Sequence, residues 1–404
     1  MQGHIDMVCE KTADREKDFL NDGIELFTDG EYIFADRTTL GGDDGIAVGM
    51  IFSVLESKNI SHPPLEAVFT VNEETGMEGA VSLDCSLLKG KTMINLDSED
   101  ENVLWVSCAG GIKNNVTLPV KRENTVSNNK IFTIRLTSLA GGHSGTDIDK
   151  NRHNAVKTLA EFLYSLGITE LYEFKGGSKD NVIPNEAFTV IGFNDEKLLK
   201  EKTEAFLNTI KNECNDDKNA VISVTKTTES LLPISESDCK NILGFLKEAP
   251  YGVIKMSESV NGLVETSLNL GTLNLNENEA VITFSLRSNI DDEKEKLCEK
   301  MKSLTEKYNG FIFTHGEYPG WEYKESSRIR DIIKTEYEKL YNKSPEIQAV
   351  HAGLECGIFY KKIENLDCVS IGPDILDIHT PKERLSIKSV QRVYNLLLNV
   401  LKEL

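Results

Sequence analysis

Long apolar runs, paired cysteines and positive charge are all scarce in this sequence. No apolar run approaches the length that crosses a membrane, and no signal peptide is recognisable. The 8 cysteines are scattered without a Cys-x-x-Cys pair, so neither a zinc ribbon nor a disulfide framework is indicated. With 45 Lys and Arg against 65 Asp and Glu, the net charge of −20 argues against nucleic acid or an anionic membrane as a partner. These absences favour a protein of the reducing cytoplasm.

What is present fits an ordinary globular protein with more than one compact part. The 404 residues are 39% hydrophobic and 27% charged, enough for two domains or for one domain interrupted by another. Both ends of the chain alternate strand-like and helix-like segments. The expected strands are residues 1–8, 65–71, 92–96, 347–350 and 367–371, and the expected helices are residues 43–55, 76–83, 326–341 and 387–401. This alternation predicts an α/β fold whose mostly parallel sheet is covered by helices.

The middle of the chain has a different pattern. Residues 131–137 and 280–287 alternate apolar and polar side chains, which is typical of an antiparallel sheet with one face in water. The helices expected to cover the other face are residues 154–166, 196–212 and 291–308. We therefore expect an inserted α+β domain at residues 111–311, flanked at 1–110 and 312–404 by the two parts of the domain that it interrupts.

A histidine and an aspartate stand two residues apart in Gly3-His4-Ile5-Asp6. On an extended strand, side chains at this spacing point to the same face. The imidazole of His4 can then bind a metal ion while the carboxylate of Asp6 orients the ring from behind. Taken alone, His4 is more often a buried histidine with ordinary hydrogen bonds, so a metal site requires further ligands elsewhere in the chain.

Several acidic residues and a second histidine follow expected strands or begin a helix. They are Asp43, Glu73, Glu74, Asp97 and His379. In open α/β sheets, sites form outside the carboxyl ends of the strands. A single Asp or Glu is more often a solvated surface charge, but two imidazoles with several carboxylates suit zinc, and also manganese or cobalt. Five ligands for two metal ions require one bridging carboxylate, which leaves positions open for water and substrate.

Seven short motifs stand in a fixed order from residue 2 to the C-terminus. They are Gln2-Gly-His-Ile-Asp-Met-Val, Thr39-Leu-Gly-Gly-Asp-Asp-Gly, Asn72-Glu-Glu-Thr-Gly, Asn95-Leu-Asp-Ser-Glu, Gly141-Gly-His-Ser-Gly, His351-Ala-Gly-Leu-Glu-Cys-Gly, and Ile371-Gly-Pro with His379-Thr-Pro. In content and order they resemble the aminoacyl-histidine dipeptidases, the cytosolic non-specific dipeptidases of the M20 metallopeptidase family.

The resemblance implies two divalent metal ions, in the first place Zn2+, held by five side chains. Asp43 would bridge the two ions, and Asp6 would orient His4. The remaining ligand pairs would be His4 with Asp97 and Glu74 with His379.

The resemblance also implies the groups that act on the substrate. Glu73 would be the general base, which takes a proton from the attacking water and delivers it to the leaving amine. His143 matches the histidine of the family's lid that steadies the oxyanion, supplied by closure of the inserted domain or by a neighbouring subunit of a homodimer. Arg287 is the candidate clamp for the peptide carboxylate, with His351 and Gly353 as further substrate contacts.

Plain structural interpretations stand beside these roles. Arg287 could equally be a surface ion-pair partner, and His351 could only shape its loop. Gly141-Gly142 could be no more than a turn, and Asp44 is most simply the acidic residue at a helix N-terminus. The histidines outside the motifs, expected to be structural or exposed, are His62, His153 and His315.

The expected function is a two-metal hydrolase that cleaves unblocked dipeptides, Xaa-His among them. A related M20 deacylase or carboxypeptidase is an alternative, although the motifs at residues 141–145 and 351–357 favour a dipeptidase. Family members carry a helix and the first strands ahead of the Gly-His-x-Asp motif, so we expect this chain to lack the family's N-terminal segment. The alternative from another class is a truncated, inactive metal-binding remnant of such an enzyme.

Overall fold

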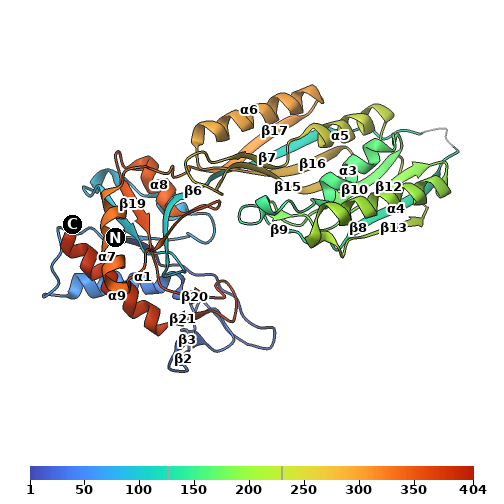
Figure 1. The fold of residues 1–404 in the computed structure, drawn as a ribbon. Helices are drawn as coiled ribbons and strands as arrows, with labels where there is room; N and C mark the ends of the chain where they lie inside the picture. Colours follow the sequence, from blue (N-terminus) through green and yellow to red (C-terminus); the bar gives the residue numbers. More distant parts are fainter. Residues whose placement is uncertain (125–127, 229–230) are drawn as a thin grey trace. The chain divides into compact units, whose positions relative to one another are not determined.

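The computed structural model describes residues 1–124, 128–228 and 231–404. These residues form two compact units (Figure 1), which we call the base unit (Met1–Cys108 with Pro319–Leu404) and the inserted unit (Ala109–Tyr318). The inserted unit continues beyond the expected end at residue 311, because strand β17 (Phe311–Tyr318) pairs along β7 (Gly110–Pro119). Each unit has its own hydrophobic core.

The base unit is built on a six-stranded sheet in the order β18-β6-β19-β5-β1-β4. Its strands are β1 (Gln2–His4), β4 (Val68–Thr70), β5 (Thr92–Asn95), β6 (Val103–Cys108), β18 (Glu346–Val350) and β19 (Asp367–Ser370). β1, β4, β5 and β19 are parallel neighbours, whereas β6 pairs antiparallel with β19 and parallel with β18. The sheet is mixed but mostly parallel, which confirms the expected α/β class.

The first strand is shorter than expected. The pattern predicts a strand over residues 1–8, but β1 ends at His4. The carboxylate of Asp6 instead accepts the backbone N–H groups of Glu73 and Glu74, at 3.1 and 3.3 Å. This contact turns the chain across the end of β4, so His4 and Asp6 do not share a strand face, contrary to the expectation from their two-residue spacing.

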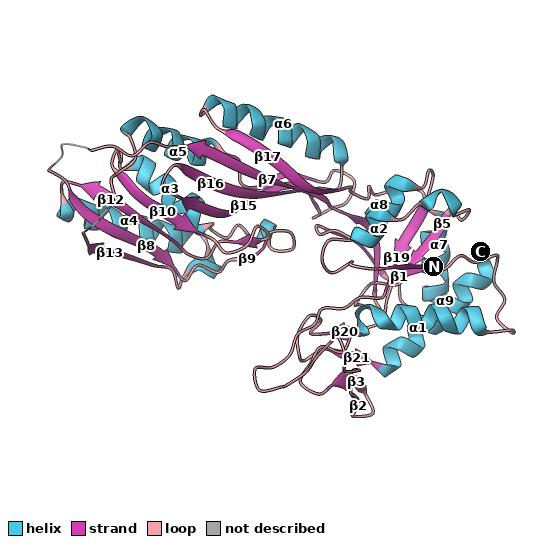
Figure 2. Ribbon diagram, turned by 180° about the vertical axis from the view of Figure 1, so that it is seen from behind, coloured by secondary structure: helices cyan, strands magenta, loops and turns pink. Residues whose placement is uncertain are grey.

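Helices cover both faces of the base sheet (Figure 2). On one face, α1 (Gly42–Glu56), α7 (Arg328–Tyr341) and α9 (Ile387–Glu403) share a core with Val369 of β19. The next residue towards the strand's start, Cys368, contacts Cys356 of α8 (Glu355–Lys362) instead. Neighbouring residues of a strand point to opposite faces, so α8, with the short α2 (Glu78–Ser82) beside it, covers the second face.

A smaller antiparallel sheet joins the two halves of the base unit. In spatial order its strands are β2 (Leu26–Thr28), β3 (Tyr32–Ala35), β21 (Arg384–Ser386) and β20 (Ile375–Leu376). β20 and β21 form a hairpin whose loop, residues 377–383, carries His379. The sequence pattern predicts none of these strands, because each is only two to four residues long and too short to show a period.

The inserted unit contains a nine-stranded sheet whose neighbouring strands all pair antiparallel within the described residues, as expected. In addition to β7 and β17, its strands are β8 (Lys130–Thr137), β10 (Leu171–Gly176), β12 (Ala187–Phe193), β13 (Val221–Lys226), β14 (Gly252–Met256), β15 (Val264–Leu275) and β16 (Glu279–Ser288). A separate ladder pairs β9 (Gly142–His143) with β11 (Val182–Ile183).

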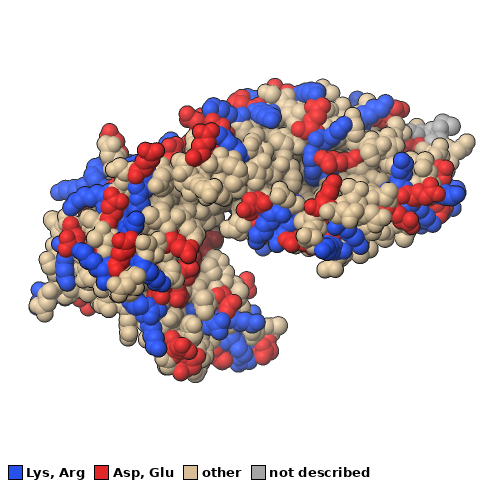
Figure 3. Space-filling view, in the orientation of Figure 1, with Lys and Arg blue, Asp and Glu red and all other residues tan. Residues whose placement is uncertain are grey.

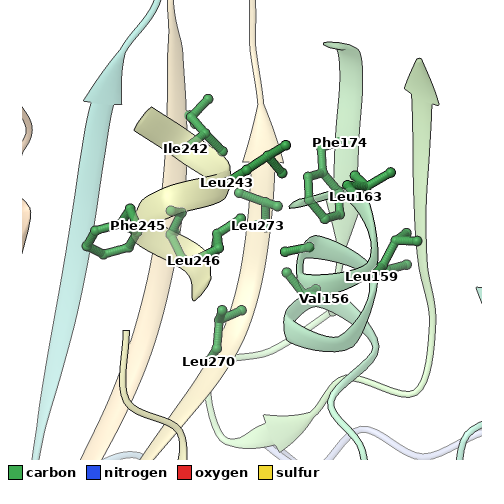
Figure 4. Close-up of a cluster of buried hydrophobic side chains, with 14 of the residues drawn as sticks. Val156, Leu159, Leu163, Phe174, Ile242, Leu243, Phe245, Leu246, Leu270 and Leu273 are labelled. Carbon is green, nitrogen blue, oxygen red and sulfur yellow. The ribbon is translucent and has the colours of Figure 1, made fainter. Parts of the chain in front are cut away.

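Helices pack against one face of this sheet and form the core of the inserted unit. They are α3 (Ala155–Ser165), α4 (Glu196–Glu213), α5 (Glu236–Glu248) and α6 (Asp291–Lys307); α3, α4 and α6 are the three expected helices, while α5 is not predicted. Figure 4 shows Leu243 and Leu246 of α5 beside Leu270 and Leu273 of β15, with Val156, Leu159 and Leu163 of α3 in the same buried cluster. In the part of the chain that the structure describes, the short 3-10 helices are η1 (Cys85–Leu87), η2 (Ile148–Lys150) and η3 (Asn215–Asp217).

The surface mixes both signs of charge. On the face drawn in Figure 3, Lys and Arg side chains are interspersed with Asp and Glu, as expected for a protein that keeps its charges solvated. Within the three described ranges, every helix is too short or too polar to span a lipid bilayer.

Candidate metal centre

The candidate ligands lie where the parallel strands of the base sheet end. His4 is the last residue of β1, Glu74 lies in the turn after β4, and Asp97 follows β5. β1 pairs in parallel with both β4 and β5, so these three side chains leave the sheet at the same edge. Asp43 joins them from the first turn of α1, and His379 from the β20–β21 loop.

Asp43 stands between the two histidines. Its Oδ1 lies 3.1 Å from His4 Nε2, and its Oδ2 lies 3.2 Å from His379 Nε2. The second neighbour of His4 Nε2 is Asp97 Oδ1, at 3.3 Å, while the second neighbour of His379 Nε2 is Glu74 Oε2, at 3.0 Å. The five side chains therefore fall into two groups, each with one imidazole and one carboxylate of its own, and Asp43 gives one oxygen to each group.

The donor set fits divalent cations. The ligand atoms of His4, Asp43 and Glu74 all lie within 4.8 Å of one another, as do those of His4, Asp44 and Asp97. Glu74 Oε1 is buried and has no hydrogen-bond partner within the described residues, although a buried carboxylate oxygen normally has one. Imidazole nitrogens with carboxylate oxygens are ligands for zinc, manganese or cobalt, and a cation would satisfy the oxygen left without a donor.

The protonation equilibria of the metal-free protein show how much negative charge is gathered here. Hydrogen bonds with Asp43 and then Glu74 raise the pKa of His379 to about 10. Burial raises the pKa of Glu73 to about 8, with further contributions from neighbouring carboxylates that include Glu355. Burial also raises the pKa of Asp97 well above its usual range. Several carboxylates thus lie close together without matching positive charge, and bound cations would neutralise this excess of negative charge.

Asp6 does not orient His4 through its carboxylate in the way expected. His4 Nδ1 lies 3.0 Å from the backbone carbonyl oxygen of Asp6 and 3.6 Å from its Oδ1. The carboxylate is hydrogen-bonded to the backbone of Glu73 and Glu74. Asp6 thus holds His4 with its main chain and the Glu73-Glu74 turn with its side chain, a second contact that the sequence spacing does not indicate.

Asp44 and Glu355 are buried acidic residues near the ligands that are not among the predicted site residues. Asp44, only 1% exposed, accepts the backbone N–H of His4 at 3.2 Å, so it is more than a helix N-terminal residue. A Cβ on Gly3 would lie 2.6 Å from Asp44 Oδ2, which explains the glycine before His4. Glu355 accepts hydrogen bonds from Gln2 Nε2 at 2.5 Å and Thr70 Oγ1 at 2.7 Å. Glu355 belongs to the motif that begins at residue 351, and this position in a motif could have marked it as a site residue.

In the inserted unit, His143 is held as a hydrogen-bond donor. Its Nδ1 accepts the backbone N–H groups of Gly145 and Thr146, at 3.3 and 3.2 Å, so the proton of the neutral ring lies on Nε2. Burial lowers the pKa of His143, and the charge of Arg287 lowers it further. The ring is therefore neutral at neutral pH and offers one N–H group.

Arg287 lies at the end of β16 and is only 8% exposed, so its interpretation as a surface ion-pair partner is wrong. Its Nη1 donates to the hydroxyl of Tyr318 at 3.1 Å, and its Nε has no hydrogen-bond partner within the described residues. Such an arginine is suited to binding an anion.

The other predicted residues lie in connecting segments or on the surface. His351, which is buried, and Gly353 lie between β18 and α8 of the base unit, and their contact with substrate stays a prediction. His62 and His315 are exposed. His153 is hydrogen-bonded to Asp217 and Glu213, a structural role as expected.

The fold and the donor set define a metallohydrolase with an inserted domain. Residues 1–403 match the model of peptidase family M20/M25/M40, and the chain belongs to this family. The cytosol non-specific dipeptidase of Escherichia coli (strain K12) is 37% identical over 412 residues, which cover 100% of this chain and 84% of that protein.

Solved structures agree with this assignment. The crystal structure of aminoacylhistidine dipeptidase from Vibrio alginolyticus is 36% identical and has a TM-score of 0.93, covering 100% of this chain and 84% of that one. A tripeptidase of Staphylococcus aureus, 15% identical with a TM-score of 0.57, covers 100% of this chain and 79% of its own, and shares the fold. The expected resemblance to the M20 dipeptidases is confirmed.

Proposed function

We propose that this protein is a two-metal dipeptidase that hydrolyses unblocked dipeptides, Xaa-His among them. The observation that carries the proposal is the carboxylate of Asp43, which presents one oxygen to His4 and the other to His379. The two most similar relatives described above are named as dipeptidases, and one of them as an aminoacylhistidine dipeptidase. The Escherichia coli relative is named as a cytosol enzyme, which supports the expected location in the cytoplasm; a homodimer stays a prediction.

In this proposal five side chains hold two divalent metal ions, in the first place zinc, while manganese and cobalt suit the same donors. Asp43 bridges, His4 and Asp97 complete one site, and Glu74 and His379 complete the other. When bound, such ions polarise a peptide carbonyl and acidify a water molecule. Asp6 keeps His4 and the Glu73-Glu74 turn in place.

Glu73 is the proposed general base. Its neighbour Glu74 points an oxygen at His379, whereas within the described residues the Glu73 carboxylate forms no hydrogen bond or ion pair with either histidine, so Glu73 is available for proton transfer. It takes a proton from the attacking water onto a carboxylate oxygen and then gives that proton to the nitrogen of the leaving amine. Its buried surroundings favour a carboxyl group that can hold a proton near neutral pH.

The inserted unit supplies the proposed donors. His143 donates its Nε2–H to the oxygen that becomes negative during attack, because its Nδ1 is already occupied as an acceptor. Arg287 binds the terminal carboxylate of the dipeptide through its guanidinium group. A free carboxylate at this position explains a preference for substrates that end one residue after the cleaved bond.

The test combines metal analysis with hydrolysis. Protein loaded with Zn2+ is analysed for metal per chain and assayed with an Xaa-His dipeptide, a dipeptide without histidine, a tripeptide, and a dipeptide blocked at its amino group. We expect two ions per chain and turnover of the unblocked dipeptides only. Two bound ions without turnover of any dipeptide would support a metal-binding protein instead, and turnover of the blocked substrate would support a deacylase.

A further inference from the structure

A buried glutamate outside the predicted ligand set binds the backbone that carries Asp43. Glu383 is 3% exposed. Its Oε2 accepts the N–H groups of Leu40 at 2.7 Å and Gly41 at 3.0 Å, and its Oε1 accepts those of Gly42 at 2.8 Å and Asp43 at 3.2 Å. Four backbone N–H groups thus converge on one carboxylate just before the regular turns of α1, which follow Asp44, and hydrogen bonds to a charged acceptor are strong.

The same loop also carries His379. Residues 377–383 connect β20 to β21, and the N–H of Glu383 closes a turn onto the carbonyl oxygen of Thr380 at 3.1 Å. His379, one residue before this turn, has a φ of 59°, a left-handed conformation that is costly outside glycine and persists where the surroundings enforce it. The loop therefore makes two contacts with Asp43: Glu383 accepts the backbone N–H of Asp43, and the ring of His379 lies beside its carboxylate.

The glycines before Asp43 permit this approach. Gly41 has a φ of 71°, in the region that favours glycine. A Cβ on Gly42 would lie 3.2 Å from Glu383 Oε1, closer than an ordinary van der Waals contact. The glycine pair ahead of Asp43 is thus matched to a carboxylate that lies 340 residues later in the chain.

We propose that Glu383 is a positioning residue for the metal centre. Its carboxylate fixes the backbone of residues 40–43 against the loop of His379, so that the two oxygens of Asp43 face the two histidines. A bridging ligand must be held to within a fraction of an ångström, and groups that orient ligands from behind commonly change metal affinity by about 10- to 100-fold. The consequence for metal binding rests on the proposed two-metal function, whereas the clamp itself does not.

The experiment uses Glu383→Gln with Glu66→Gln as its control. The glutamine amide keeps one acceptor oxygen but turns an NH2 group towards two of the four donors. Glu66 also accepts backbone N–H groups, from Lys89 and Gly90, but it precedes β4 and so lies at the opposite edge of the sheet from the ligands. The readouts are hydrogen exchange of peptides containing residues 40–43 in the metal-free proteins, and the Kd for Zn2+ against a competing chelator well below Tm.

We expect faster exchange at residues 40–43 and a Kd raised about 10- to 100-fold in Glu383→Gln, with both values near wild type in Glu66→Gln. Faster exchange with an unchanged Kd would overturn the proposal, because Glu383 would then only cap α1. If Glu383→Gln does not fold, Glu383→Asp, which keeps the charge but is shorter, is measured in the same way and judged by the same two results. Failure of the proposed function would appear separately, as a wild-type protein that does not bind two ions.

Discussion

The two units place a histidine in opposite electrostatic surroundings. In the base unit, His379 lies among carboxylates, and hydrogen bonds with Asp43 and Glu74 raise its pKa to about 10. In the inserted unit, burial and the charge of Arg287 lower the pKa of His143. The same residue type is thus surrounded by acceptors in one unit and stands beside a cation in the other.

Because of this difference, the two units are suited to binding groups of opposite charge. A cluster of carboxylates and imidazoles attracts cations, while a neutral imidazole N–H beside a buried guanidinium attracts anions and developing negative charge. Peptide hydrolysis needs both, because water must be activated and the oxyanion stabilised. In the proposed function the metal ligands belong to the base unit and the hydrogen-bond donors to the inserted unit, so substitutions in the two units should have different effects on metal content and kinetics.

The largest effect is expected from the general base. Glu73→Gln should lower kcat by about 10⁴-fold, the upper part of the range for a lost proton-transfer group, with metal content unchanged because Glu73 is not a proposed ligand. Metal analysis and steady-state kinetics on the same preparation test this. Glu74→Gln is the matched contrast and should lose metal. Metal loss from Glu73→Gln with none from Glu74→Gln would mean that the two roles are exchanged.

The next effect concerns the bridge. Asp43→Ala should remove more metal than His4→Ala, because it strips a ligand from both ions and leaves two cations to repel each other. Metal per chain, measured after dialysis against one chelator concentration, compares the two variants directly. Equal loss from both would count against a carboxylate shared between His4 and His379.

Much of the base-unit site could be predicted because it depends on short, local signals. His4, Glu74 and Asp97 each stand at or just after an apolar strand, and parallel strands bring their carboxyl ends to one edge. Asp43 is marked by the glycines and the helix that follows it. The pattern also placed His379, in the loop after the expected strand 367–371, and the resemblance to a family added its role as a ligand; the strands β20 and β21 that hold this loop were too short to predict.

The contacts that hold the ligands could not be predicted in this way. Glu383 and Asp43 are 340 residues apart, and no periodicity relates a loop carboxylate to the amides of a distant helix start. The second role of Asp6 was missed for a related reason: β1 ends at His4, so the spacing rule for a strand did not apply to Asp6. The proposed metal ligands could be predicted from residue type and position in the sequence, whereas the residues that hold these ligands in place depend on the tertiary structure.

In the inserted unit, His143→Ala should lower kcat by about 10²–10³-fold, the range for losing one oxyanion donor, with a smaller change in KM and intact metal content. A group that meets negative charge mainly in the transition state affects turnover more than ground-state binding. His315→Ala, at an exposed histidine of the same unit, is the control and should resemble wild type. Near-normal kcat in His143→Ala would reduce His143 to a turn residue.

The smallest effect is expected at Arg287. Arg287→Lys keeps the positive charge but loses the planar pair of donors that fits a carboxylate, so KM for dipeptides should rise about tenfold, as for one lost charge-assisted hydrogen bond, with kcat changed less. The matching substrate change is a dipeptide amide, which lacks the terminal carboxylate. Wild type should bind the amide poorly, and Arg287→Lys should discriminate less between amide and acid. If both proteins show the same ratio of KM values, Arg287 does not bind the carboxylate.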